Sequence, residues 1–179
     1  MRQSYKTSII FILLLIPVLS QFLIPQQFVK PPNWDAWKFL FGEWVGEGGG
    51  STPGQASGGS KFYLDLQERI LIRTNYAQFP ATKDRPSFTH NDLMIIYQEA
   101  QTTRAVYYDN EGHVIYYTPQ FSPDQNTLTF TGDIKPNEPR FRLTYIKEQD
   151  NKLKLKFEIA PPGKPEEFSL YLESKMIKK

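Results

Sequence analysis

The stretch Lys152–Ile159, with the sequence KLKLKFEI, is the clearest indication of the fold. Every second residue in it is apolar and the residues between are charged, which is the period of a β-strand with one buried face. A strand of this kind belongs to an antiparallel sheet that meets water on one side. The apolar face consists of Leu153, Leu155, Phe157 and Ile159.

The same alternation continues in the stretches on both sides. Before Lys152, the apolar face carries Phe141, Leu143 and Tyr145; after Ile159, it carries Phe168, Leu170, Leu172 and Met176. Turn residues such as Asp109-Asn110-Glu111-Gly112 separate further short strands. The strands we expect are 43–50, 60–66, 68–76, 90–98, 103–109, 113–118, 127–131, 139–147, 152–160 and 166–177.

These strands follow one another without the spacing of βαβ units. A short helix over 34–41, capped by Asn33 and ended by Gly42, comes before them. The sequence therefore predicts an all-β fold, a closed antiparallel meander β-barrel of about ten strands with a short N-terminal helix. Closure would leave no exposed sheet edge, and a β-sandwich is the competing architecture.

The composition excludes several kinds of site. The 179 residues include no Cys and two His, so disulfides, thiolate metal sites, a cysteine nucleophile and a three-histidine metal site are ruled out. Arg2 and Lys6 account for the whole formal charge of +2, which leaves the rest of the chain neutral. We therefore expect no nucleic-acid partner. The basic residues Arg140, Arg142, Lys152, Lys154 and Lys156 are interpreted as a solvated outer face.

The first residues are typical of a targeting segment. Arg2 and Lys6 precede the apolar run 8–19, the pattern of an export signal. We expect residues 1–20 to be this signal, residues 21–32 a proline-containing linker, and residues 33–179 the barrel. The protein would then be periplasmic or secreted. The alternative is an uncleaved anchor to about residue 25, which would be the one point of membrane attachment.

The motif Gly42-Glu43-Trp44, after the short helix and at the start of the first strand, resembles the opening of lipocalin-like (calycin) barrels. The longer run Phe41–Gly50 is similar to the start of the nitrobindin branch. The stretches Tyr108–Ile115 and Phe157–Pro165 resemble parts of exported bacterial proteins of unassigned function. The resemblance implies a ten-strand barrel closed at one end by Trp44.

The nitrobindin-like pattern also implies haem held by a histidine near the C-terminal strands. The last histidine here is His113, and a tyrosine such as Tyr145 or Tyr171 would have to serve instead. We therefore expect no haem and no other cofactor.

The aromatic and charged residues of the strands suggest a small apolar or amphipathic ligand inside the barrel. Ordinary packing of a filled core is the competing interpretation of the same aromatics. In the pairs Tyr107/Tyr108 and Tyr116/Tyr117 one residue faces the interior, and a shift of one position would exchange them. The expected ligand contacts are Phe62, Leu64, Ile72, Arg73, His90, Arg104, Tyr107, Tyr116, Phe130 and Phe157.

His90 and His113 each open a strand and are the candidates for acid–base chemistry. With Asp92, Asp109 or Glu111 they could form a metal site, but a histidine at the end of a hairpin is more often a polar turn residue, and we expect no metal. The alternative functions are thus a small-molecule isomerase or cyclase that uses His90 or His113, and a structural or interaction module of the cell envelope. A cluster of seven glycines over 46–59 is interpreted as a flexible hairpin loop at the barrel mouth.

Overall fold

The computed structural model describes residues 30–47 and 57–179. The expected export signal, the linker up to residue 29 and the middle of the glycine cluster lie outside the described residues. Residues Pro31–Lys179 form one compact unit. No helix among the described residues has the length and apolar character that crossing a membrane requires.

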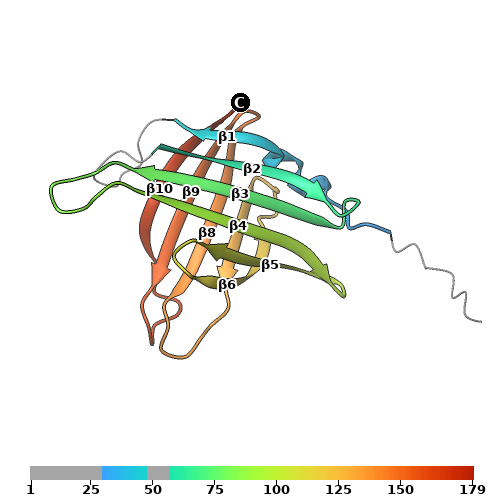
Figure 1. Cartoon of the computed structure of the whole chain (residues 1–179). Helices are drawn as coiled ribbons and strands as arrows, with labels where there is room; N and C mark the ends of the chain where they lie inside the picture. Colours follow the sequence, from blue (N-terminus) through green and yellow to red (C-terminus); the bar gives the residue numbers. More distant parts are fainter. Residues whose placement is uncertain (1–29, 48–56) are drawn as a thin grey trace, which may run out of the picture. The chain divides into compact units, whose positions relative to one another are not determined.

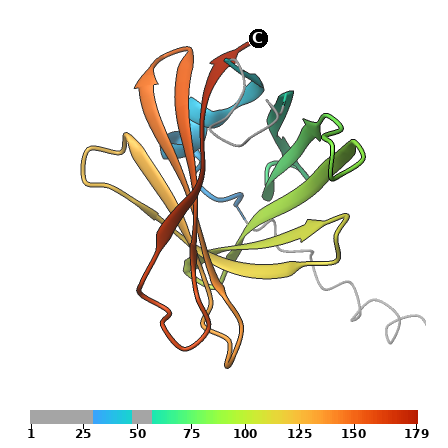
Figure 2. The ribbon, with the colours of Figure 1, turned by 90° about the vertical axis from the view of Figure 1, so that its left-hand side faces the viewer.

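The expected ten-strand barrel is confirmed (Figure 1). Each strand is antiparallel to the next in the chain, and β1 pairs with β10 to close the cylinder. The strands are β1 (Gly42–Gly46), β2 (Ser57–Asp65), β3 (Ile70–Phe79), β4 (Phe88–Glu99), β5 (Thr102–Asp109), β6 (Val114–Phe121), β7 (Thr127–Gly132), β8 (Arg140–Gln149), β9 (Lys152–Ala160) and β10 (Ser169–Lys178). Strands β3–β6 and β8–β10 form opposite sides of the barrel (Figure 2).

The short helix is present as a single 3-10 helix, η2 (Asp35–Leu40). Its Trp37 packs edge-on against Phe121 and against Phe130 of β7. Trp44 is 1% exposed and its indole Nε1 donates a hydrogen bond of 2.7 Å to the carbonyl of Leu40. The helix thus contributes Trp37 and Leu40 to the hydrophobic core, to which Trp44 also belongs.

Alternation along β9 has the expected direction. Leu153 and Leu155 are buried, and Phe157 and Ile159 face the interior farther along the strand. In β10 the prediction is wrong for its first part. A β-bulge between Leu170 and Leu172 adds one residue, so Leu170 is 57% exposed while Leu172 and Met176 face inward.

The basic residues on the outer face of β8 and β9 each have an acidic partner. Arg142 and Glu158 form two hydrogen bonds of 2.7 and 2.8 Å. The other pairs are Arg140–Glu166, Lys152–Glu47, Lys154–Glu148 and Lys156–Glu173. This face therefore carries balanced charge.

Candidate ligand-binding cavity

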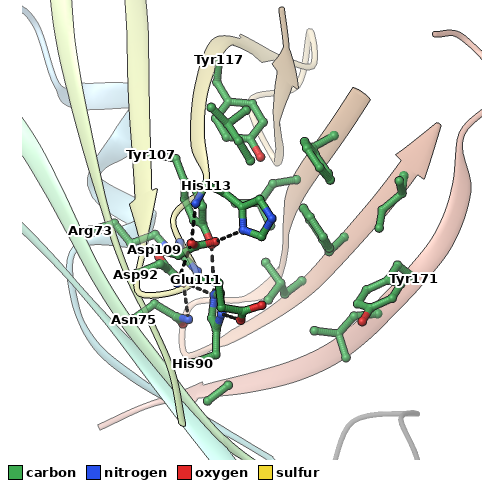
Figure 3. A pocket seen from close by; sticks show the side chains of 18 of the residues that line it. Arg73, Asn75, His90, Asp92, Tyr107, Asp109, Glu111, His113, Tyr117 and Tyr171 are labelled. Carbon is green, nitrogen blue, oxygen red and sulfur yellow. Dashed lines mark hydrogen bonds and ion pairs between the residues drawn. The ribbon is translucent and has the colours of Figure 1, made fainter. Parts of the chain in front are cut away.

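A cavity of about 380 Å³ occupies one part of the barrel interior (Figure 3). Two different walls enclose it. The side from β3–β6 and the turn between β5 and β6 carries nine polar side chains, which form the polar wall, together with the apolar Ala77, Phe79, Phe88 and Ile115. The side from β8–β10 is apolar except for the Tyr171 hydroxyl and forms the apolar wall. We define the polar wall as Arg73, Asn75, His90, Asp92, Tyr107, Asp109, Glu111, His113 and Tyr117, and the apolar wall as Phe141, Leu143, Leu155, Phe157, Ile159, Tyr171 and Leu172.

Strand register creates the polar wall. Asn75 of β3 is paired with Asp92 of β4, and Asp92 is paired in turn with Asp109 of β5. Cross-strand partners point to the same face of a sheet, so these three side chains form one row across three strands. Residues that lie 17 positions apart in the sequence thereby become neighbours.

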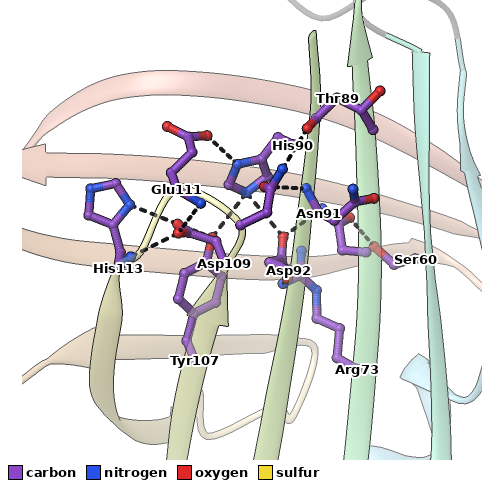
Figure 4. Close-up of polar contacts among 12 residues, drawn as sticks. Ser60, Arg73, Thr89, His90, Asn91, Asp92, Tyr107, Asp109, Glu111 and His113 are labelled. Atoms are coloured by element: carbon purple, nitrogen blue, oxygen red, sulfur yellow. Dashed lines mark hydrogen bonds and ion pairs between the residues drawn. The ribbon is translucent and has the colours of Figure 1, made fainter.

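Arg73 and Asp92 form a buried ion pair at the base of the polar wall. The guanidinium Nη1 lies 2.6 Å from Oδ1 of Asp92 (Figure 4). Asn75 donates a hydrogen bond of 2.7 Å to Oδ2 of the same carboxylate. Burial disfavours the charged carboxylate. The charge of Arg73 and the hydrogen bonds from His90 and Asn75 outweigh this effect and lower the pKa of Asp92.

His90 lies between two carboxylates and a phenol. Its Nδ1 is 2.6 Å from Oε1 of Glu111, and its Nε2 is 3.0 Å from the Tyr107 hydroxyl and 3.4 Å from Asp92. The hydrogen bond to Asp92 makes the largest contribution, and Glu111 adds to it, so the pKa of His90 rises to about 9 despite partial burial. His90 is consequently a cation and a hydrogen-bond donor at neutral pH.

Asp109 organises the turn between β5 and β6. Its Oδ1 accepts hydrogen bonds from the backbone N–H groups of Glu111 and His113, and its Oδ2 is 2.8 Å from Nδ1 of His113. Burial opposes ionisation, but these bonds outweigh it and lower the pKa of Asp109. The turn that carries Glu111 and His113 is thereby fixed at the cavity.

Two tyrosines complete the polar wall. The Tyr107 hydroxyl donates a hydrogen bond of 3.2 Å to Asp109. Tyr117 is 1% exposed, and its ring packs edge-on against those of Tyr107 and Phe130. Burial raises the pKa of both phenols above the usual value, so both remain protonated donors.

Four of the ten expected ligand contacts line the cavity. They are Arg73, His90, Tyr107 and Phe157. Three others are part of the packed core outside the cavity, namely Phe62, Leu64 and Phe130. The structure thus places these seven expected contacts inside the barrel.

The remaining three expected contacts lie on the outer face of the barrel. Ile72 precedes the inward-facing Arg73, so the two neighbours cannot share a face. Arg104 binds Thr118 and Asp133 outside, and Tyr116 is 44% exposed while Tyr117 faces inward. The expectation that Ile72, Arg104 and Tyr116 face the interior is therefore wrong.

The sequence also left Asn75, Tyr117 and most of the apolar wall out of the expected site. The sequence offered Tyr117 as the alternative to Tyr116, since one member of this pair was expected to face the interior. Asn75 carries no distinguishing signal, because only its pairing with Asp92 brings it to the cavity. Both histidines line the cavity, as the acid–base hypothesis requires, and their catalytic role stays a prediction.

That the protein binds neither a metal nor haem stays a prediction. No group of three or more His, Cys, Asp or Glu side chains within 30–47 and 57–179 is arranged to hold a metal ion. The haem pattern requires a histidine from the C-terminal strands. Of the cavity-lining residues on β8–β10, all within the described part of the chain, Tyr171 alone has a polar side chain, and it is 66% exposed.

The fold and the cavity define the class of protein: a closed antiparallel ten-strand barrel with an internal ligand-sized cavity. The chain is similar to the crystal structure of Rv2717c from M. tuberculosis, with a TM-score of 0.56 and 15% sequence identity over 84% of this chain and 99% of that chain. At this identity the similarity establishes the fold alone. No family model and no curated protein match the chain.

Proposed function

We propose that this protein binds a small amphipathic molecule in the barrel cavity, with the apolar part of the ligand against β8–β10 and its polar end against β3–β6. The single observation that carries the proposal is the division of the cavity into two walls. A volume of about 380 Å³ lies within the size range of small-molecule sites.

Each wall has a physical reason to favour such a ligand. The aromatic rings of Phe141 and Phe157 are stacked with centroids 5.9 Å apart, and Tyr171 meets Phe157 edge-on. Removing an apolar chain from water against these rings provides the binding free energy. The hydrogen-bonding groups opposite them orient the polar end. The resemblance to lipocalin-like barrels, and to the nitrobindin branch among them, supports ligand binding in the same way and belongs to this proposal.

A variant whose side chain fills the cavity tests the proposal. Ala77 of β3 lines the cavity, whereas its neighbour Tyr76 is 44% exposed on the outer face. We expect the uncharged dye Nile red to bind the full chain with increased fluorescence. The variant Ala77→Trp should lower this binding by roughly tenfold or more, because the indole occupies the space of the ligand.

The matched control is Tyr76→Trp, which adds an indole to the same strand but outside the barrel. It should bind Nile red as the wild type does. If the wild type does not bind the dye, or if Ala77→Trp binds it equally well, ligand binding in this cavity is ruled out.

The site of action forms a second part of the proposal. The basic start and the apolar run of residues 1–20 support export to the periplasm or the medium. These residues lie outside the part of the chain that the structure describes.

A further inference from the structure

Tyr117 presents a hydrogen-bond donor that the protein itself does not use. Its side chain is buried and its hydroxyl points into the cavity (Figure 3). Among residues 30–47 and 57–179 this hydroxyl has no hydrogen-bond partner. The hydroxyl is not among the enclosed polar atoms that lack a partner, so it is open to the cavity, and an acceptor supplied there would receive its hydrogen bond.

The base of the polar wall is also short of acceptors. Within the described residues, two buried polar atoms have no partner, Nε of Arg73 and the hydroxyl of Tyr145. The Arg73 guanidinium lies over the Tyr145 ring, 5.9 Å from its centroid. Both atoms are closed to the cavity, so a ligand cannot reach either of them, and the Tyr117 hydroxyl is the unused donor that faces its head group.

An anionic head group does not suit this wall. Arg73 is neutralised by Asp92, and His90 by Asp92 and Glu111. The wall has three carboxylates, Asp92, Asp109 and Glu111, against the two cations Arg73 and His90. Asp109 is paired with His113. A carboxylate ligand would thus approach an excess of negative charge with no free cation to receive it.

A cationic head group suits it no better. Both oxygens of Asp92 already accept from Arg73, Asn75 and His90. Both oxygens of Asp109 accept from Tyr107 and from the turn that ends at His113. An ammonium group would compete with these donors, and it offers no lone pair to the Tyr117 hydroxyl.

We propose that the cavity selects an uncharged amphiphile whose head group is an oxygen acceptor, such as a ketone or aldehyde carbonyl, bound by the hydroxyl of Tyr117. This inference rests on the proposed function, since it names the class of ligand for the same cavity. It distinguishes this barrel from one that would carry fatty-acid anions or long-chain amines.

The test uses three compounds that share one alkyl chain and differ in charge: decan-2-one, decanoate and decylammonium. Each is titrated into the full-length protein at neutral pH by isothermal titration calorimetry. We expect decan-2-one to bind most tightly. The variant Tyr117→Phe should weaken decan-2-one binding by roughly five- to tenfold, the effect of one neutral hydrogen bond.

Tyr116→Phe is the matched control, because it removes a hydroxyl from the neighbouring residue on the outer face. It should leave the affinity for decan-2-one unchanged. Tighter binding of decanoate or decylammonium, or an unchanged ketone affinity in Tyr117→Phe, overturns the assigned head group and leaves ligand binding standing. If none of the three compounds binds, the proposed function fails and this inference fails with it.

Discussion

The imidazole of His90 links β4, β5 and the turn between β5 and β6. Asp92, Glu111 and Tyr107 are the titratable groups that face it, and the two carboxylates raise its pKa to about 9. The folded-state pKa is raised above the unfolded value, so the native state binds the proton more tightly. This contribution to stability is fully present below pH 6.5, the ordinary pKa of the imidazole, and is lost as the pH rises through about 9.

The variant His90→Gln should therefore be destabilised most at low pH. The shift in pKa, reduced for the partial solvent exposure of the ring, corresponds to about 1–2 kcal/mol. We expect the loss in free energy of unfolding, measured in urea, to be larger by that amount at about pH 6 than at about pH 9.5. In NMR, one of the two imidazole signals should titrate near pH 9 and be absent from the variant. Titration of both signals near the ordinary value would contradict the ion-paired arrangement.

At the scale of strands, alternation in the sequence predicted the number and order of the elements but not every facing direction. In β9 the charged and apolar residues alternate without exception, so the inward face was unambiguous. In β3 and β6 both members of a neighbouring pair suit an interior position. A local pattern cannot choose between Tyr116 and Tyr117, because cross-strand pairing decides it. The bulge in β10 has no sequence signal of its own and reverses the direction of Leu170.

The sequence only partly indicated the structure at the two ends of the glycine cluster 46–59. Its flanks are strand residues: Gly46 belongs to β1, and Gly58 and Gly59 belong to β2. A Cβ on Gly58 would lie 2.5 Å from the Tyr76 carbonyl oxygen of β3, which no side-chain movement could relieve. A Cβ on Gly46 would make an ordinary contact of 3.7 Å.

These distances predict opposite outcomes for the same substitution. Gly58→Ala should lower the free energy of unfolding by about 1–3 kcal/mol, because β2 must move away from β3. Gly46→Ala should change it by less than about 1 kcal/mol, since alanine also loses less backbone entropy on folding. Urea unfolding of both variants measures the difference. Equal effects would show that the close approach of β2 to β3 does not require glycine.

At the scale of the whole molecule, the barrel interior has a filled part and a hollow part. The aromatic rings of Trp37, Phe62, Phe130 and Tyr145 fill the first part and contact one another edge-on or tilted. The cavity occupies the second part. The sequence predicted an apolar interior but not this division, because apolar residues of both parts have the same alternating pattern. Which of them meet one another depends on the closure of β1 on β10 and on the register of all ten strands.

Substitutions of two phenylalanines should differ in their effect on stability, because one lies in the filled part of the barrel and the other lines the cavity. Phe130 is 0% exposed and packs against Trp37, Tyr117 and Tyr145, so Phe130→Ala should lower the free energy of unfolding by about 3–5 kcal/mol. Phe157 lines the cavity and lacks neighbours on that side, so Phe157→Ala should cost only about 1–2 kcal/mol. It should nevertheless weaken Nile red binding, because it removes part of the apolar wall. Urea unfolding and dye titration of the two variants separate these effects. Equal losses of stability would mean that Phe157 is packed as tightly as Phe130, and the cavity beside it would then be too small for a ligand.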